Sequence, residues 1–599
     1  MQPTIKILEK INQNSQQNSN EIFTRLYRYL LRPDIYYIAY KNLYANNGAS
    51  TEGVDNDTAD GFSVEKVQRL IDSLADESYY PKPSRRTYIK KPNGKQRPLG
   101  IPTFSDKLVQ EVLRMVLESV YEPVFRNTSH GFRPKKSCHT ALNMVQNNFK
   151  GVRWFIEGDI KGCFDNINHG KLIDIIGRKI KDARLIKLLY KFLKAGYLED
   201  WVYNNTYSGT PQGGVISPIL ANIYLHELDL FAEKLKADFD KPQHRYYNSE
   251  YDKARSRVYY LRKLIGKAEG EQRQQLIAEM HQKRALMFKL PAKPQTDKKL
   301  VYVRYADDFL IGINGSKEEC EEVKAQFKSF IGNELAMDLS EEKTLITHSN
   351  DYARFLGHDI RIRRDFTIKP GGQGYTKRTL SNSCELNVPL NDKIHKYLFN
   401  KGIVEQNASG ELEPVKRRNL IRLPDIEIID TYNAELRGIC NFYGYASNFS
   451  RFTYLSYLFE YSLLKTLAAK HQCTIAKIKR RFKDGKGKWC IPYNTKKGIK
   501  HRYFANWQDC KKPSFCKDEI AKTGFYHLNS RSTFEERLNA KVCELCGITG
   551  DSVKYEIHHV NKIKNLKGKT KWEQCMIAKR RKTLVVCKKC HYDIHNNRI

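Results

Sequence analysis

Apolar positions follow two different spacings in the first 160 residues. They recur at helical spacing in 64–74, 107–121 and 140–149, which predicts three helices with apolar faces toward a core. Alternation in 154–160 predicts a strand, and two β-like runs on either side of a Pro-Asn-Gly turn at 92–94 predict a hairpin. The two spacings together indicate a chain of the α+β class.

A highly charged stretch, 237–294, differs from its surroundings. It holds two helical patterns, 251–267 and 271–290, separated by a break at Gly266 and Gly270. This predicts a helical hairpin inserted into another domain. A solvated structural insert is the default interpretation. The alternative is RNA contact through four basic residues: Arg255, Arg257, Arg262 and Lys263.

Aromatic and basic residues dominate the last third of the chain. Strand signals fade beyond Gly371, and 430–470 is helical and rich in Tyr and Phe. The stretch 477–512 then holds thirteen Lys and Arg against two Asp. Because basic side chains bind phosphates and flat rings stack on bases, it predicts a nucleic-acid surface. The rings are Phe482, Trp489, Tyr493, Tyr503, Phe504 and Trp507.

The composition indicates a polyanionic partner. Lys and Arg number 103 against 67 Asp and Glu, which gives a net charge of +36. The length of 599 residues predicts about three to five domains. Hydrophobic residues at 40% exclude global disorder. No window has the ~18 apolar residues of a membrane span, and 1–20 lacks a signal core. We therefore expect an intracellular protein without a membrane partner, in a bacterial cytoplasm or an organelle matrix.

Acidic residues stand at the ends of predicted strands. In 301–313, Asp307 and Asp308 separate two short apolar strands, and Asp159 lies at the end of the strand at 154–160. Adjacent carboxylates repel each other unless a cation lies between them. Because Mg²⁺ takes oxygen ligands and bridges phosphates, acidic residues beside basic ones indicate phosphoryl transfer. For the Asp307–Asp308 pair alone, a solvated turn is the alternative.

Cysteine and histidine cluster at the C-terminus. Two Cys-x-x-Cys pairs have the spacing of a closed tetrahedral Zn²⁺ site, and four unrelated thiols are the alternative. The nearby histidines cannot all replace cysteine in a complete site, so they suggest a second, open metal site. The residues are Cys543, Cys546, Cys587 and Cys590, with His558, His559, His591 and His595.

The order of these segments resembles that of group II intron-encoded proteins, which are reverse transcriptase–maturases, here with a C-terminal HNH endonuclease. The sequence Tyr-Ala-Asp-Asp at 305–308 is similar to the polymerase active-site box. Asp159, with Phe164 five residues on, is similar to the first catalytic motif. The resemblance covers nearly the whole chain. Further matching segments are 90–102, 210–218, 339–344 and 355–358.

The resemblance implies a multidomain α+β fold. Residues 1–375 would form the fingers and palm of a right-hand polymerase, with the helical insert at about 237–294. Residues 376–475 would form an α-helical thumb, called domain X. Residues 476–535 would be a basic DNA-binding segment, and 536–599 a small ββα-metal HNH module with a four-cysteine zinc site.

The resemblance also implies roles in DNA synthesis. Asp159 and Asp307 would hold two Mg²⁺, with Asp308 as an accessory ligand. Phe164 would be the steric gate that excludes a ribose 2′-OH. The other substrate contacts would be Lys95 and Arg97 for the triphosphate, Gln212 for template or nucleotide, and Lys343 near the leaving group.

In the HNH module, the resemblance makes His559 the general base that activates water. His558, His591 and His595 would ligate a catalytic divalent metal, for which Mg²⁺ is expected as well. The family's middle Asn has no counterpart, and Thr583 stands at about its position. A structural zinc module that only binds DNA is the alternative.

The function implied is that of an RNA-directed DNA polymerase and maturase for intron mobility. Its partners would be the group II intron RNA, double-stranded target DNA and dNTPs. It would assist splicing, nick the target and copy the RNA from the cleaved 3′ end. A splicing-only maturase is disfavoured by the retained Asp159, Asp307 and Asp308. A stand-alone reverse transcriptase is disfavoured by the long thumb and the nuclease module.

Overall fold

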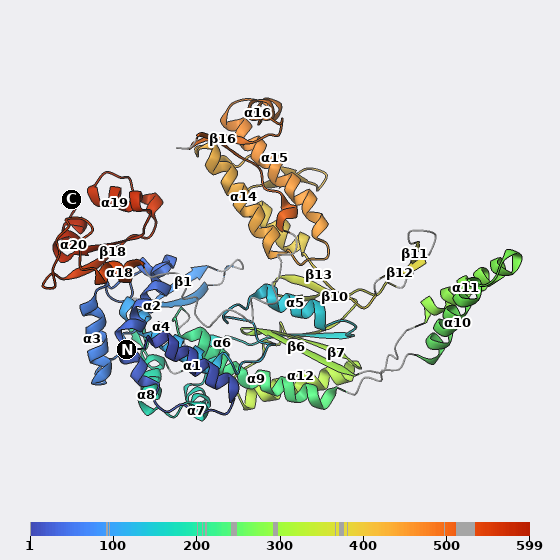
Figure 1. Ribbon diagram of the computed structural model, residues 1–599, viewed down its shortest axis with the longest axis horizontal. Coiled ribbons are helices and arrows are strands. Elements are labelled where there is room, and N and C mark those ends of the chain that lie inside the picture. The colour runs from blue at the N-terminus through green and yellow to red at the C-terminus, as the bar shows by residue number, and fades with distance from the viewer. Residues whose placement is uncertain are drawn as a thin grey trace.

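The ribbon of the computed structural model separates into bodies that differ in secondary structure (Figure 1). N-terminal helices and the C-terminal module lie together at one end, and the helices of 388–510 rise above the sheets. Within the described part of the chain, no helix is long and apolar enough to cross a membrane. The described residues are 2–90, 94, 96–199, 202–206, 208–209, 213–240, 248–290, 298–365, 367–370, 376–379, 381–495, 498–510 and 533–598.

Four helices build the N-terminal region. The two helices predicted at 64–74 and 107–121 are confirmed, and side-chain oxygens cap them: Ser63 accepts from the N–H of Lys66, and Thr103 from that of Asp106. The helix predicted as amphipathic at 107–121 is instead buried on nearly every side. The elements are α1 (Thr4–Gln17), α2 (Pro33–Tyr44), α3 (Val64–Ala75) and α4 (Phe104–Tyr121).

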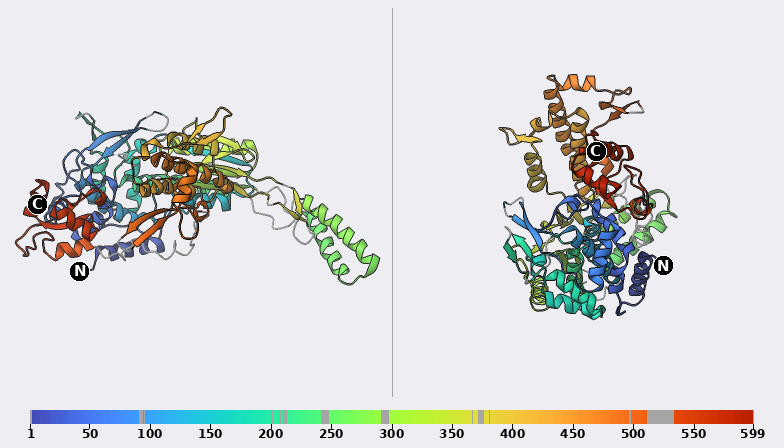
Figure 2. Two further views of the ribbon diagram at one scale, coloured as in Figure 1. Left: turned by 90° about the horizontal axis from the view of Figure 1, so that it is seen from above. Right: turned by 90° about the vertical axis from the view of Figure 1, so that its left-hand side faces the viewer.

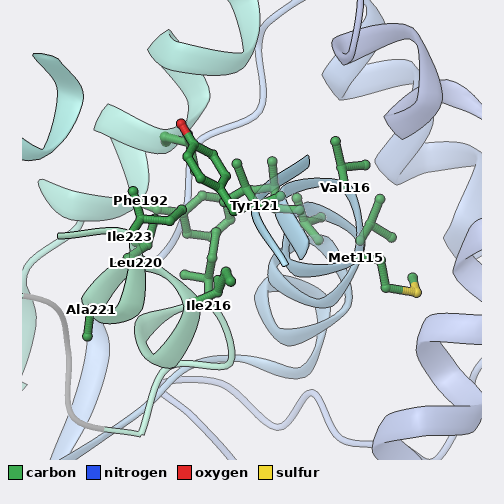
Figure 3. Close-up of a cluster of buried hydrophobic side chains, with 14 of the residues drawn as sticks. Met115, Val116, Tyr121, Phe192, Ile216, Leu220, Ala221 and Ile223 are labelled. Atoms are coloured by element: carbon green, nitrogen blue, oxygen red, sulfur yellow. The ribbon is translucent and has the colours of Figure 1, made fainter. Parts of the chain in front are cut away.

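The core around α4 joins this region to the rest of the fold. Figure 3 shows Tyr121 of α4 near Phe192 and a group of apolar side chains around the start of another helix, with Met115 and Val116 on the other side of α4. These residues belong to one buried cluster. The partner helices are α7 (His169–Lys179), α8 (Ala183–Leu193) and α9 (Ser217–Phe239).

A second sheet carries the predicted basic hairpin. Its strand order is β2-β1-β4-β5, and Arg85 pairs with Ile101 at the base of the antiparallel β1–β2 hairpin. The prediction of a hairpin here is therefore confirmed. The strands are β1 (Ser84–Lys90), β2 (Gln96–Ile101), β4 (Tyr197–Glu199) and β5 (Val202–Asn204).

The main sheet, with strand order β6-β7-β3-β8, lies between two cores. Side chains alternate between its faces: Leu300 and Tyr302 belong to the core with α9, whereas Val301 and Val303 belong to a core with α5. The strands are β3 (Trp154–Asp159), β6 (Lys299–Tyr305), β7 (Asp308–Asn314) and β8 (Leu345–His348). The helices on the two faces include α5 (Cys138–Asn148), α9 and α12 (Lys317–Asn333).

The charged insert folds as predicted. It forms two helices, α10 (Ser249–Ile265) and α11 (Gly270–Lys289), which pack against each other. An ion pair of 2.7 Å between Arg257 and Glu279 links them. Figure 2 shows the pair apart from the sheets and the nearby helices, as a solvated insert would be.

Residues 388–510 share one hydrophobic core. The expectation that strands fade beyond Gly371 is wrong, because β13 (Cys384–Asn387) pairs with β10 (His358–Ile362), and two later hairpins follow. The helical stretch 430–470 is two helices, separated at 443–451. The elements are β14 (Val404–Gln406), β15 (Leu412–Pro414), α14 (Asp425–Phe442), α15 (Phe452–Lys470), α16 (Ile475–Arg481), β16 (Ile491–Thr495) and β17 (Gly498–Arg502).

The C-terminal module is small and has two antiparallel strands. His559 of β18 lies opposite Thr583 of β19, and α20 follows β19 directly. Apolar side chains of the module belong to the same core as the N-terminal helices. The elements are α18 (Thr533–Asn539), β18 (Tyr555–His559), α19 (Lys571–Lys579), β19 (Thr583–Cys587) and α20 (Lys588–His595).

A buried ion pair connects the main sheet to α9. Arg304 of β6 and Asp229 of α9 are both fully buried, and the guanidinium donates to the carboxylate at 2.8 and 2.6 Å. Arg304 also donates to the carbonyl of Ala306 at 2.9 Å and to the hydroxyl of Ser129 at 2.8 Å. The charge is thus fully hydrogen-bonded, as burial requires.

Asp229→Ala is expected to lower the free energy of unfolding by about 3–5 kcal/mol, because it leaves the Arg304 charge buried without a counterion. Denaturant unfolding of the full chain measures this. The control is Glu321→Ala, which breaks the exposed helical pair Lys317–Glu321; little change is expected there. Equal effects in both variants would contradict the importance of the buried pair.

Candidate active sites

The three carboxylates predicted from the strand ends come together at one end of the main sheet. Asp159 ends β3 and lies directly opposite Asp308, the first residue of β7. Tyr305 pairs with Asp308, so only Ala306 and Asp307 form the turn. Ala306 is in the left-handed region with φ of +57°, which turns the chain sharply and puts Asp307 beside the other two.

The carboxylates at this end of the sheet repel one another. Burial, the charge of Asp307 and a hydrogen bond with Asp159 raise the pKa of Asp308 to about 7. Burial and the charge of Asp159 also raise the pKa of Asp307, against the charges of Arg97 and Lys343. Such crowding favours a bound cation, and divalent metals take carboxylate ligands.

Lys343 meets the first of these carboxylates. Its Nζ lies 2.7 Å from Oδ2 of Asp159, and this hydrogen bond raises the pKa of Lys343. A backbone hydrogen bond also holds Asp159 in place, because the N–H of Ser340 donates to the carbonyl of Asp159 at 2.8 Å. Lys343 therefore partly neutralises the charge of the carboxylate site.

Two other predicted substrate residues, Arg97 and Phe164, lie in the described part of the chain. Arg97 is an exposed residue of β2, close enough to Asp307 to influence its titration. Phe164 follows the turn after β3 and contacts the ring of Phe132 edge-to-face at 5.9 Å. Lys95 and Gln212 lie outside the described residues.

Two glycines let backbone and rings approach the acidic turn. A Cβ on Gly131 would lie 2.3 Å from the backbone nitrogen of Ala306, and one on Gly158 would lie 2.1 Å from the ring of Phe309. Neither glycine was predicted as part of the site. Each is a single Gly, Gly131 in a turn and Gly158 in a predicted strand, and a single Gly is a weak signal.

The four predicted cysteines form one cluster. Their Sγ atoms all lie within 4.8 Å of one another, and those of Cys546 and Cys587 are 3.9 Å apart. Zn–S bonds of about 2.3 Å in a tetrahedron put sulfurs about 3.8 Å apart. Burial opposes ionisation, but backbone hydrogen bonds lower the pKa of Cys543 to about 7, which favours the thiolate ligand. The cluster therefore fits a structural zinc.

The three histidines predicted as metal ligands also come together, with one residue that was missed. Nε2 of His591 and Nε2 of His595 are 3.3 Å apart, and Asp60 completes a group whose ligand atoms lie within 4.8 Å. His558 is the third histidine. The carboxylate of Asp60 comes from a loop almost 500 residues earlier, so sequence spacing gave no signal for it.

A carboxylate behind His591 orients it. Nδ1 of His591 lies 2.6 Å from Oε2 of Glu556, which leaves Nε2 toward the centre. This is the carboxylate–histidine arrangement found behind metal-binding imidazoles. Burial opposes charging, yet hydrogen bonds to Asp60 and Glu556 outweigh it and raise the pKa of His591 to about 9.

His559, the predicted general base, is held by one contact of its backbone and one of its ring. Its backbone N–H donates to Oδ1 of Asp60 at 2.6 Å, and its ring Nε2 lies 3.1 Å from the carbonyl of Tyr44. A carbonyl only accepts, so Nε2 carries the proton and Nδ1 is the basic nitrogen. Thr583, in place of the expected Asn, accepts a hydrogen bond from Arg537 at 2.8 Å.

The basic–aromatic stretch at 477–512 differs from its prediction. Phe482 is buried, and Trp489, Phe504 and Trp507 pack against the core of 388–510. The prediction that these four rings face bases is therefore wrong. The basic side chains remain outward: Lys477, Arg480, Arg481, Lys483, Lys486, Lys488 and Lys500 are exposed.

A stack of exposed tyrosines lies nearby on α15. Tyr454 and Tyr457 are 51% and 46% exposed, with nearly parallel rings 6.3 Å apart. The ring of Tyr461 is tilted by 41° against that of Tyr457, 4.5 Å away, and Lys479 lies over the Tyr461 ring. Flat rings beside basic groups are suited to single-stranded nucleic acid. A groove on the same body is lined by Lys416, Arg418, Lys465 and Lys477.

Models of three known protein families match three parts of the chain. Family models match at 89–246 (reverse transcriptase, RNA-dependent DNA polymerase), 381–523 (type II intron maturase) and 543–591 (AI2M/AI1M-like HNH endonuclease). The group II intron-encoded protein LtrA of Lactococcus lactis subsp. cremoris is 57% identical over 600 residues, covering all of both chains. The chain belongs to the group II intron-encoded proteins. It is thus an RNA-directed DNA polymerase and maturase with an HNH endonuclease domain.

Other relatives of this intron-encoded protein come from fungi. The uncharacterized 91 kDa protein in cob intron of Schizosaccharomyces pombe is 37% identical, over 99% of this chain and 72% of the relative. The putative COX1/OXI3 intron 2 protein of Saccharomyces cerevisiae is 31% identical, over 99% and 68%. The similarity to all three extends from the reverse transcriptase to the HNH domain.

Gly131→Ala is expected to slow DNA synthesis by this intron-encoded protein about 10²-fold, because the new Cβ displaces the turn that carries Asp307. A primer-extension assay on an RNA template measures the rate. Gly177→Ala on α7 is the control, since its Cβ meets nothing within 4 Å. An unchanged rate for Gly131→Ala would show that the turn tolerates movement.

Proposed function

We propose that the protein synthesises DNA at Asp159, Asp307 and Asp308 and nicks DNA at the histidine cluster of its HNH domain. The observation that carries the first assignment is the convergence of three carboxylates at one end of the main sheet, where burial and neighbouring charges raise the pKa of Asp307 and Asp308. Asp159 and Asp307 are the proposed ligands of two Mg²⁺, with Asp308 accessory. Bound Mg²⁺ would stabilise negative charge on the attacking and leaving oxygens.

The chain's own residues bind and orient the substrates. In synthesis, the primer 3′-oxygen bonds to the α-phosphorus and loses its proton to solvent, while the bond to the β-phosphate breaks and pyrophosphate leaves. Arg97 and Lys343 lie at the carboxylate site and are proposed to hold the triphosphate and the leaving group. Phe164 is proposed as the gate beside the sugar, and Lys95 and Gln212 keep their predicted substrate roles.

In the HNH domain, His558, His591 and His595 are the proposed ligands of a divalent metal, for which Mg²⁺ is the expected ion. Buried imidazole nitrogens and the Glu556–His591 pair support this. His559 is the proposed base that takes a proton from water; burial lowers its pKa, which keeps the imidazole neutral. The four cysteines are proposed to hold Zn²⁺ and brace the domain.

The remaining surfaces are proposed to bind intron RNA and target DNA. We assign 1–375 to fingers and palm, 376–475 to the thumb, 476–535 to DNA binding and 536–599 to the nuclease. The tyrosine stack of α15 and the groove residues Lys416, Arg418 and Lys465 of the thumb favour RNA, and the exposed Lys and Arg of 477–500 favour duplex DNA. Together these activities would carry out splicing and target-primed reverse transcription.

Asp307→Asn is expected to lower primer extension by more than about 100-fold, because loss of a metal ligand exceeds the 10–100-fold effect of outer residues. Binding of intron RNA and nicking of target DNA should stay at wild-type level. His559→Ala is the matched variant with the opposite result: nicking is lost and primer extension is kept. If either single variant lost both activities, the two sites would not be independent.

A further inference from the structure

Asp60 is held against the nuclease centre by the backbone around it. The N–H of Gly61 donates to the carbonyl of Ile557 at 3.0 Å, and the N–H of Ile557 donates to that of Phe62 at 2.9 Å. This adds a short antiparallel bridge to β18. Phe62 is fully buried and stacks on Tyr40 of α2 at 4.1 Å. The position of the Asp60 carboxylate is thus fixed by the fold.

The carboxylate contacts every histidine of the cluster. Its Oδ2 lies 2.6 Å from Nε2 of His595 and 3.2 Å from Nε2 of His591, and its Oδ1 lies 3.3 Å from Nδ1 of His558. Nε2 of His558 is buried without a hydrogen-bond partner among the described residues, and the approach of its Nδ1 to Asp60 lacks hydrogen-bond geometry. Such nitrogens are suited to a metal bond, and three imidazoles with one carboxylate make a four-ligand set.

We propose that Asp60 is the fourth ligand of the nuclease metal, and that this bond keeps the nuclease closed while the HNH domain is docked on the N-terminal helices. The proposal rests on the metal site assigned to the HNH domain above. A catalytic centre needs a ligand position open to the scissile phosphate. Mg²⁺ and Mn²⁺ take about six ligands, so Asp60 closes the centre by competition: its carboxylate occupies a position that the negatively charged phosphate would otherwise take, and it repels the phosphate.

The contact between the HNH domain and the N-terminal region also buries the general base. His559 is only 7% exposed, and its ring lies edge-on to that of Tyr44 at 6.0 Å. With Nε2 bound to the carbonyl of Tyr44, the basic Nδ1 is buried and has no hydrogen-bond partner in the described part of the chain. A base sealed in this way cannot activate water, so target DNA must displace the N-terminal loop before cleavage.

The test uses the full-length protein carrying Asp307→Asn, which weakens the other metal centre. Asp60→Ala and Asp60→Asn are compared with Asp72→Ala, which removes an exposed carboxylate from α3. Asp60→Asn keeps an oxygen that can accept from the N–H of His559, so it covers the case in which the alanine variant unfolds. Mn²⁺ binding followed by electron paramagnetic resonance is the first readout. Nicking of supercoiled plasmid at saturating Mn²⁺, without intron RNA, is the second.

Both Asp60 variants are expected to bind Mn²⁺ at one site at least tenfold more weakly than Asp72→Ala, and to nick the plasmid several-fold faster. Equal Mn²⁺ affinity in the three proteins would overturn the ligand, and nicking no faster than in Asp72→Ala would overturn the closure. Adding His559→Ala to Asp60→Asn must abolish the nicking. If the double variant still nicked the plasmid, the assignment of the nuclease to His559 would be wrong. The Mn²⁺ affinities would still decide separately whether Asp60 is a metal ligand.

Discussion

The repulsion among Asp159, Asp307 and Asp308 is the constraint on which the polymerase half of the structure depends. Three acidic groups can be held together at one end of the main sheet only if the surrounding fold resists their separation. Pairing of β3 with β7 fixes two of them face to face. The buried Arg304–Asp229 pair fixes the third, because Arg304 also binds the carbonyl of Ala306 in the turn. The repulsion lowers the stability of the folded protein, and the same repulsion makes the site favour a bound cation.

The HNH domain also depends on residues from distant parts of the chain. The HNH domain shares a hydrophobic core with the N-terminal helices, and its histidines surround a carboxylate from the loop before α3. The reverse transcriptase and the nuclease therefore pack against each other, although their catalytic residues are separate. The contact brings the first 62 residues and the last 60 into one site, which gives a physical route for coupling DNA cleavage to the state of the polymerase.

Sequence reasoning succeeded where chemistry is local. The Tyr-Ala-Asp-Asp turn, the Cys-x-x-Cys pairs and the histidines of β18 and α20 all lie where their spacing predicts, since strand pairing and helix turns bring near neighbours together. It failed where partners are distant. Asp229 and Arg304 are 75 residues apart, and Asp60 and His559 are 499 apart, so no periodicity links them. It also failed for Trp489 and Trp507, because composition cannot tell a ring in a core from one that faces nucleic acid.

The most direct test of the account is thermal unfolding of wild type and Asp307→Asn over a Mg²⁺ series. If repulsion is relieved by a bound ion, the metal-free variant is at least as stable as metal-free wild type. Mg²⁺ at about 100 times its Kd should then stabilise wild type by about 2.7 kcal/mol more than the variant. A variant that is less stable without metal and keeps the full response to Mg²⁺ would contradict the claim that these carboxylates are assembled for a metal.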